Sequence, residues 1–151
     1  MEPQIIANVP TGGAGEQKNA ELNMSKRRPT VLIIDDSQFN IEMARAALQA
    51  RGYNVVATQD SRAALKLARE AEPDLVLCDL RMPGPDGFTV LSMMHADNKL
   101  RSRPFIFISA TIFSDGERRL GRALGATRFL SYPISPNRLL DEVDSLLQRY
   151  S

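Results

Sequence analysis

The sequence has few of the residues that build disulfide frameworks and zinc sites. Its 151 residues include one cysteine, Cys78, one histidine, His95, and no tryptophan. A single cysteine excludes an intramolecular disulfide, and one cysteine with one histidine cannot complete the four-ligand set of a structural zinc site. Disulfide-stapled and zinc-dependent folds are therefore excluded.

Long apolar runs and an excess of charge of one sign are also absent. No run approaches the roughly 18 apolar residues that cross a bilayer, and the N-terminus lacks the basic, apolar and small-residue order of a signal peptide. The net charge of +1 at pH 7 gives no electrostatic reason to expect nucleic acid or a membrane as partner. We therefore expect a cytoplasmic protein that binds neither.

The two ends of the chain differ in composition. Residues 1–28 contain several glycines and amides and few large apolar side chains, so they cannot bury enough surface to offset the entropy of ordering. We predict a disordered tail there. The remaining residues, 29–151, have the length of one domain, and we expect a stand-alone module.

From residue 29 onward, short apolar runs alternate with amphipathic stretches of helical length, the rhythm of a parallel α/β fold. The runs predict five strands, at 31–34, 55–57, 75–78, 105–108 and 128–130. Helices are predicted after Asp36, after Asp60 or Ser61, over 87–95, after Ser114 and after Ser135. Their apolar spacing turns Met43 and Leu120 toward the core. The pattern predicts a doubly wound five-stranded parallel sheet with five helices.

Acidic residues directly follow two of the predicted strands. Asp35 and Asp36 come after the first strand, and Asp79 comes after the third. If these strands lie side by side, the three carboxylates converge within about 5 Å of one another. At an effective dielectric near 20, two unit charges at that distance repel by roughly 3 kcal/mol. Oxygen ligands that need a counter-charge indicate a hard cation, and Mg²⁺ is the natural fit.

Helix capping is the alternative role for Asp36, because an acidic side chain often caps the helix that follows a strand. Capping accounts for one acid only. It does not explain the adjacent Asp35, nor Asp79 at the end of another central strand.

Four motifs in a fixed order resemble the receiver domain of two-component response regulators. They are VLIIDD at 31–36, LVLCDLRMP at 75–83 with Asp86-Gly87, FISA at 107–110, and Gly125-Ala126 leading to Tyr132-Pro133. The resemblance covers residues 29–150. It implies a flavodoxin-like sheet with strand order 2-1-3-4-5.

The resemblance also assigns roles to the acidic residues. Asp79 would be the phosphoacceptor, which takes a phosphoryl group from a phosphohistidine on a sensor histidine kinase or phosphotransfer protein. Mg²⁺ would be held by Asp36 directly, by Asp35 largely through water, by Asp79, and by the backbone carbonyl of Arg81.

Two further residues stand where the family has its switch. Ser109 matches the hydroxyl that bonds a phosphoryl oxygen after phosphorylation, and Phe129 matches an aromatic residue that rotates inward with it. The plain alternatives are a strand-end hydroxyl bonded to nearby backbone for Ser109 and a core ring for Phe129.

The chain departs from the family at Tyr132, where a lysine usually precedes the proline after the fifth strand. An ammonium about 4 Å from a phosphoryl oxygen contributes on the order of 4 kcal/mol at an effective dielectric near 20, whereas a neutral hydrogen bond contributes roughly 1 kcal/mol. The nearest replacement cations in sequence are Arg81 and Arg128. The phosphorylated state is therefore expected to be harder to form or to couple to the switch.

Two functions compete. In the first, Asp79 is phosphorylated in spite of Tyr132, because the metal ligands and the nucleophile are intact. In the second, the chain is a pseudo-receiver that serves as a protein-interaction adaptor without phosphorylation. We favour the first, because a domain without phosphoryl chemistry has no physical reason to keep three mutually repelling carboxylates.

The predicted protein is a switch and not an enzyme, apart from self-phosphorylation from small donors and autodephosphorylation. A phosphatase of the dehalogenase superfamily would need an acid two residues after its nucleophile, where this chain has Arg81. We expect output through contacts with an unknown downstream protein, from a monomer or weak dimer.

Overall fold

The computed structural model describes residues 27–147, and the predicted tail at 1–28 lies outside these residues except for its last two positions. Within them the chain forms five α-helices, one short 3-10 helix and five strands. In chain order they are β1 (Thr30–Ile34), α2 (Gln38–Ala50), β2 (Asn54–Thr58), η1 (Ser61–Ala63), α3 (Ala64–Ala71), β3 (Leu75–Asp79), α4 (Gly87–His95), β4 (Phe105–Ser109), α5 (Asp115–Leu124), β5 (Arg128–Ser131) and α6 (Pro136–Leu147).

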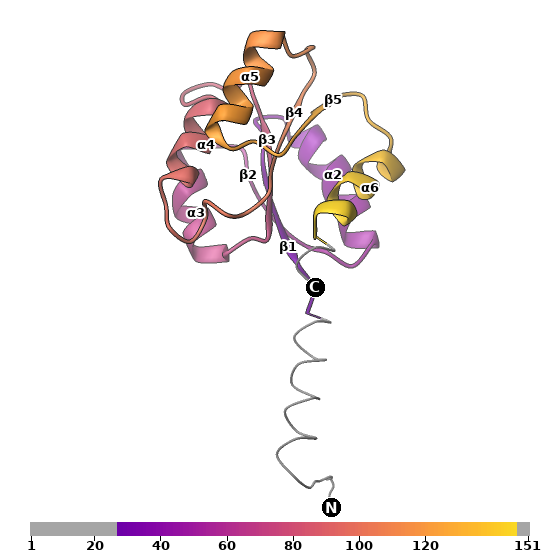
Figure 1. Ribbon diagram of the computed structural model, residues 1–151. Helices are drawn as coiled ribbons and strands as arrows, with labels where there is room; N and C mark the ends of the chain where they lie inside the picture. The colour runs from indigo at the N-terminus through magenta and orange to yellow at the C-terminus, as the bar shows by residue number, and fades with distance from the viewer. Residues whose placement is uncertain (1–26, 148–151) are drawn as a thin grey trace, which may run out of the picture.

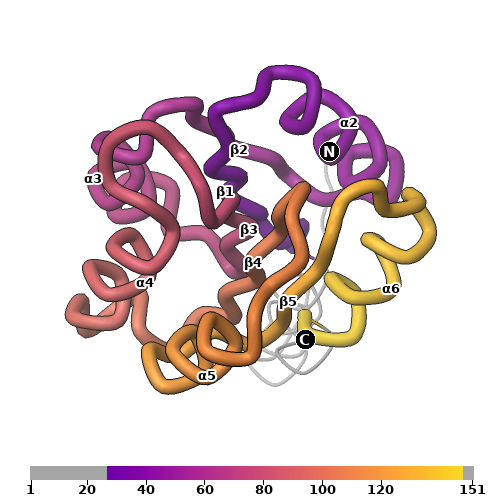
Figure 2. Tube along the Cα trace, turned by 90° about the horizontal axis from the view of Figure 1, so that it is seen from above, coloured from indigo at the N-terminus to yellow at the C-terminus, as the bar shows by residue number. Residues whose placement is uncertain are grey.

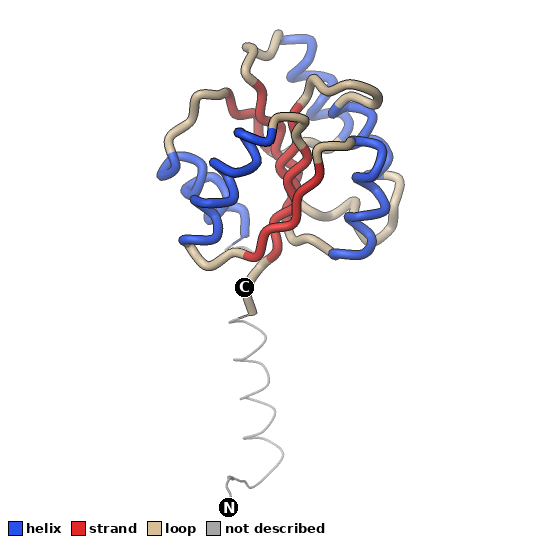
Figure 3. The backbone as a smooth tube through the Cα atoms, turned by 180° about the vertical axis from the view of Figure 1, so that it is seen from behind, coloured by secondary structure: helices blue, strands red, loops and turns tan. Residues whose placement is uncertain are grey.

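The strands form one parallel sheet of order β2-β1-β3-β4-β5. The sheet is a layer between two groups of helices, with α2 and α6 on one face and α3, α4 and α5 on the other (Figures 1 and 3). This arrangement confirms the predicted doubly wound fold and its 2-1-3-4-5 strand order.

Each face of the sheet has its own hydrophobic core because successive side chains of a strand point to opposite sides. In β1, Val31 and Ile33 pack in the core under α2 and α6, whereas Leu32 and Ile34 pack in the core under α3 and α4. Every residue of β3 and β4 is buried or nearly so, as continuous apolar runs predict for central strands.

Polar side chains fix where the helices start. Ser37 caps α2 by accepting a hydrogen bond from the Asn40 backbone N–H at 3.2 Å, so the capping alternative for Asp36 is wrong. Ser114 and Glu117 form a capping box at the start of α5, the helix predicted after Ser114. The Ser37 cap starts α2 close to the end of β1, so that Asp35 and Asp36 lie in the short loop between them.

Two predicted core residues are exposed. Met43 keeps 50% of its surface accessible, because it lines an apolar groove of about 340 Å³ with Phe39 and Ile134. Leu120 keeps 47%. Its helix turns Gly121 inward, where an added Cβ would lie 2.6 Å from the Phe129 ring. The close approach of backbone and ring therefore sets the rotation of α5, and Leu120 faces outward.

Residues 27–147 contain no helix with the length and apolar character that spanning a membrane requires.

Candidate functional site

Three carboxylates meet at the carboxyl edge of the sheet, the edge from which Figure 2 views the molecule. Strands β1 and β3 are neighbours, and Ile34 is in register with Cys78. The residues that follow this pair are Asp35 and Asp79, and Asp36 is next. One oxygen from each of the three carboxylates lies within 4.8 Å of the others, which is the convergence that the sequence predicts.

The three acids differ in their surroundings. Asp35 is buried and accepts hydrogen bonds from the Ser37 backbone N–H at 2.9 Å and from Asn40 Nδ2 at 3.3 Å. Asp36 is exposed, so that this side of the cluster opens to water. Asp79 is 9% exposed and accepts one backbone hydrogen bond, from Arg81 at 3.3 Å.

Charge is poorly compensated in this cluster. Burial raises the pKa of Asp35, against the hydrogen bonds from Ser37 and Asn40, which lower it. Burial and the charge of Asp35 raise the pKa of Asp79 to about 7. A cluster of this kind needs a proton or a cation to relieve the repulsion. Its donors are oxygen atoms only and one side is open to water, and this donor set fits Mg²⁺.

The serine predicted as a switch hydroxyl lies beside this cluster. Ser109 is buried at the end of β4, next to β3. Its Oγ accepts a hydrogen bond from the Thr111 backbone N–H at 3.2 Å and lies 3.1 Å from Thr111 Oγ1. The hydroxyl is therefore held by the following loop, as the plain alternative predicts, and it stands at the strand end that the switch role requires.

Phe129 lies in an aromatic cluster under α5. Its ring centroid is 5.2 Å from that of Phe113 and 5.7 Å from that of Phe107. The guanidinium groups of Arg118 and Arg122 lie over the ring, at 5.7 and 5.5 Å from its centroid. The ring is half-buried and packed against α5, as expected for a core aromatic.

Tyr132 extends its side chain toward the acidic cluster. The Tyr132-Pro133 peptide bond is cis. The hydroxyl is buried and, among residues 27–147, has no hydrogen-bond partner of good geometry. Burial and the charges of Asp35 and Asp79 raise its pKa, so the phenol is neutral at physiological pH. Tyr132 therefore brings no positive charge to the acidic cluster.

Two residues beside the site were not predicted from the sequence. Thr111 and Glu117 both contact Arg81: Arg81 Nε donates to Thr111 Oγ1 at 2.9 Å, and its guanidinium lies 3.0 Å from a Glu117 carboxylate oxygen. The capping motif identifies Glu117 as structural, but no pattern in the sequence pairs it with Arg81. Nothing in the structure tests the predicted role of the Arg81 carbonyl, which stays a prediction.

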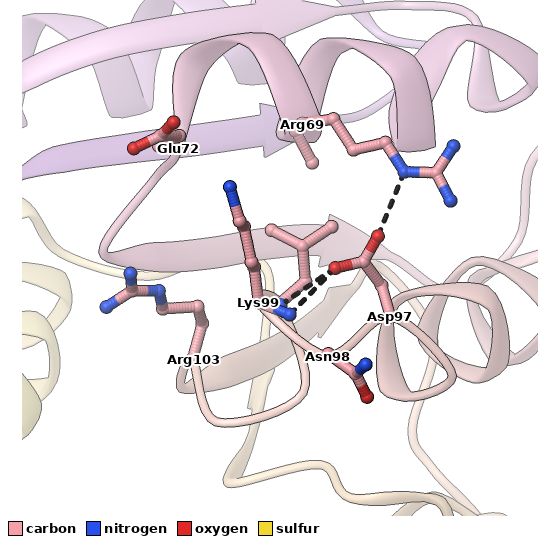
Figure 4. Close-up of a pocket in the computed structure, with 8 residues that line it drawn as sticks. Arg69, Glu72, Asp97, Asn98, Lys99 and Arg103 are labelled. Carbon is pink, nitrogen blue, oxygen red and sulfur yellow. Dashed lines mark hydrogen bonds and ion pairs between the residues drawn. The ribbon is translucent and has the colours of Figure 1, made fainter.

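A second hollow lies at the opposite edge of the sheet, at the amino ends of β3 and β4. This α3 cavity has a volume of about 580 Å³ and is lined by Ala68, Arg69, Glu72, Asp97, Asn98, Lys99, Leu100 and Arg103 (Figure 4). Its aspartate, Asp97, is bound by Arg69 Nε at 2.9 Å and by two backbone N–H groups. The cavity is remote from the acidic cluster.

Known proteins resemble this chain over most of its length. The family model of the response regulator receiver domain matches residues 31–144. The polar-differentiation response regulator DivK of Brucella anthropi is 34% identical over 118 residues, which are 78% of this chain and 95% of DivK.

Solved structures share the fold. The chemotaxis protein CheY4 of Vibrio cholerae has a TM-score of 0.77 and 30% identity, over 80% of this chain and 100% of CheY4. A response regulator from Thermotoga maritima, 20% identical, has a TM-score of 0.72 over 81% of this chain and 99% of its own. With the acidic cluster at the carboxyl edge of a 2-1-3-4-5 sheet, these matches show that the chain belongs to the response regulator receiver domain family.

Proposed function

We propose that the protein is a Mg²⁺-dependent phosphoacceptor that receives a phosphoryl group on Asp79 and signals through contacts with other proteins. The observation that carries this proposal is the meeting of three carboxylates within 4.8 Å at the ends of two central strands. Repulsion among these carboxylates destabilises the fold. Phosphoryl transfer with a bound divalent cation is a function that requires them.

The donor is a phosphohistidine on a histidine kinase or phosphotransfer protein. An Asp79 oxygen forms a bond to phosphorus while the phosphorus–nitrogen bond breaks. The electron pair leaves with the histidine nitrogen, which takes up a proton, and Asp79 becomes an acyl phosphate. Asp79 attacks as the carboxylate, so relief of the repulsion that raises its pKa also favours the reactive form.

Asp36, Asp79 and the Arg81 carbonyl would hold Mg²⁺ directly, and Asp35 through water. The cation neutralises charge on the transferred oxygens when it is bound. Asp35 itself is positioned by Ser37 and Asn40. After transfer, the Ser109 hydroxyl would exchange Thr111 for a phosphoryl oxygen, and Phe129 would rotate inward with it.

Incubation with acetyl phosphate and Mg²⁺, followed by intact-mass measurement, tests the proposal. We expect a gain of one phosphoryl group that is absent from Asp79→Ala and retained by Asp141→Ala, which removes an exposed aspartate of α6. A gain that survives Asp79→Ala contradicts the assignment. If the wild type gains nothing from acetyl phosphate or from a phosphorylated phosphotransfer protein, the proposal is wrong.

One observation favours a second function, a pseudo-receiver adaptor that works without phosphorylation: the lysine position holds the neutral Tyr132. An adaptor would bind its partner equally in wild type and Asp79→Ala. A phosphorylation switch would bind it differently with and without beryllofluoride, which mimics the phosphoryl group.

The protein acts as a switch and not as a turnover enzyme in this proposal. Sustained hydrolysis of a generic phosphate ester, dependent on Asp79, would contradict it. Size-exclusion chromatography with light scattering tests the predicted monomer or weak dimer, and fractionation of cells tests the predicted cytoplasmic location.

A further inference from the structure

No basic side chain of residues 27–147 forms an ion pair with the carboxylates of the acidic cluster, and the neighbouring Tyr132 is neutral. Two arginines close to Asp79 or to Tyr132 in sequence could supply a positive charge, and the structure distinguishes them. Arg128 is bound to Glu142 of α6 at 3.3 Å, on the α6 side of the sheet. Arg81 lies two residues after Asp79, and its side chain contacts the loop that follows Ser109.

Arg81 is part of a chain of contacts that begins at the Ser109 hydroxyl. Ser109 Oγ lies 3.1 Å from Thr111 Oγ1, and Thr111 Oγ1 accepts from Arg81 Nε at 2.9 Å. The guanidinium is bound on its far side to Glu117 at 3.0 Å. The positive charge is therefore two hydrogen bonds from the predicted switch hydroxyl.

The present partners hold Arg81 only weakly. Its side chain is 50% exposed and that of Glu117 is 23% exposed, and exposed ion pairs contribute little stability. A phosphoryl group carries more negative charge than a carboxylate and offers oxygen atoms that match the guanidinium fork. An aspartyl phosphate therefore competes favourably with Glu117 for Arg81.

We propose, on the basis of the proposed function, that Arg81 supplies the positive charge that the acidic cluster lacks. When Asp79 is phosphorylated, the Arg81 guanidinium leaves Glu117 and binds the phosphoryl group. Thr111 loses the donated hydrogen bond of Arg81 at the same moment, which frees Ser109 Oγ to turn to the phosphoryl oxygen.

The exchange carries a consequence for α5. Glu117 closes the capping box of this helix by accepting from the Ser114 backbone N–H at 2.9 Å, while Ser114 Oγ accepts from the Glu117 N–H at 3.0 Å. The carboxylate that Arg81 releases is thus the one that holds the start of α5. Phosphorylation of Asp79 thereby changes the contacts at the start of α5, because Glu117 loses its ion pair with Arg81.

The rate of phosphorylation by acetyl phosphate, followed by intact mass, tests this assignment with two opposing substitutions. Arg81→Gln removes the charge and keeps the backbone carbonyl, and we expect the rate to fall about tenfold or more. Glu117→Gln removes the competing charge, and we expect the rate to rise about two- to fivefold. Arg128→Gln is the matched control and should keep the wild-type rate.

Relocating the charge separates a direct role from a structural one. The double variant Arg81→Gln with Tyr132→Lys places an ammonium beside Asp35 and Asp79, and we expect it to recover most of the lost rate. A purely structural role for Arg81 would not be rescued in this way. Amide shifts of Ser114 and Glu117 should change on addition of beryllofluoride in the wild type and change less in Arg81→Gln.

Failure of this inference is distinguishable from failure of the proposed function. If Arg81→Gln is phosphorylated at the wild-type rate while Asp79→Ala is not phosphorylated, the phosphoacceptor stands and the role of Arg81 is wrong. If Arg81→Gln is slow but Tyr132→Lys gives no recovery, the charge role is also wrong. If the wild type accepts no phosphoryl group from any donor, both proposals fall.

Discussion

Two aspartates at opposite edges of the same sheet are in contrasting surroundings. In the α3 cavity, Asp97 accepts hydrogen bonds from Arg69 and from the backbone of Lys99, and these bonds lower its pKa. At the carboxyl edge, Asp79 has one backbone hydrogen bond and faces Asp35, and its pKa rises to about 7.

The contrast separates structural charge from functional charge. Arg69 and two backbone N–H groups compensate the charge of Asp97, so this residue stabilises the loop before β4. The charge of Asp79 is opposed by its neighbours. The ionised carboxylate therefore destabilises the folded state unless a proton or a cation is bound. Uncompensated charge in a strand-end cluster is typical of a functional site.

The largest predicted effect comes from distorting the scaffold of the acidic cluster. In Gly87→Ala the new Cβ would lie 2.6 Å from the Asp79 backbone carbonyl oxygen and 2.9 Å from Leu80 Cα. Because backbone cannot move aside easily, we expect a loss of about 2 to 3 kcal/mol in the free energy of unfolding. Denaturant unfolding measures it. Gly116→Ala, whose Cβ has room, is the control and should not destabilise.

A smaller effect of opposite sign is expected at Asp79. The pKa of Asp79 is raised from 3.8 to about 7, so stability is lost as pH rises from about 4 to about 7, where the carboxylate is ionised in the unfolded chain and still protonated in the folded one. Asp79→Asn removes that loss and should stabilise the Mg²⁺-free protein by about 1 to 2 kcal/mol at pH 8, with the gain disappearing below pH about 4. Thermal unfolding across this range checks it. A destabilised Asp79→Asn at pH 8 would show that the charge is compensated after all.

The smallest effect is expected at Asp97, with the reverse pH dependence. Its pKa is lowered, so its stabilising contribution is present above the unfolded value of 3.8 and is lost as pH falls through the folded value. Asp97→Asn should therefore lower the melting temperature at pH 7, and the difference from the wild type should shrink as the pH falls below 3.8. Phosphorylation of this variant should equal that of the wild type. A loss of phosphorylation in Asp97→Asn would show that Asp97 affects the acidic cluster, and its role would then not be structural alone.

Much of the fold was predictable because it depends on features that a sequence displays directly. Strands β3 and β4 are continuous apolar runs, and the structure extends each predicted run by one residue, to Asp79 and Ser109. The meeting of the three carboxylates was predictable for the same reason: in parallel strands, a polar residue just after an apolar run must lie at the carboxyl edge.

The contacts of long side chains were not predictable. Arg81 bonds to Thr111 and Glu117, which are 30 and 36 positions later in the chain and reach it only because β4 lies beside β3. The outward direction of Leu120 depends on how closely Gly121 approaches Phe129, a distance set by packing between α5 and the sheet. Such features depend on tertiary geometry, and no periodic pattern in the sequence predicts them.

The most direct test of the central claim is a titration of the protein with Mg²⁺, followed by the amide resonances of residues 35–37 and 79–82. We expect saturable shifts concentrated at these positions in the wild type and in Asp97→Asn, and their loss in Asp36→Asn. Shifts that are absent from this edge of the sheet, or that persist unchanged in Asp36→Asn, would contradict a divalent-cation site built from these carboxylates.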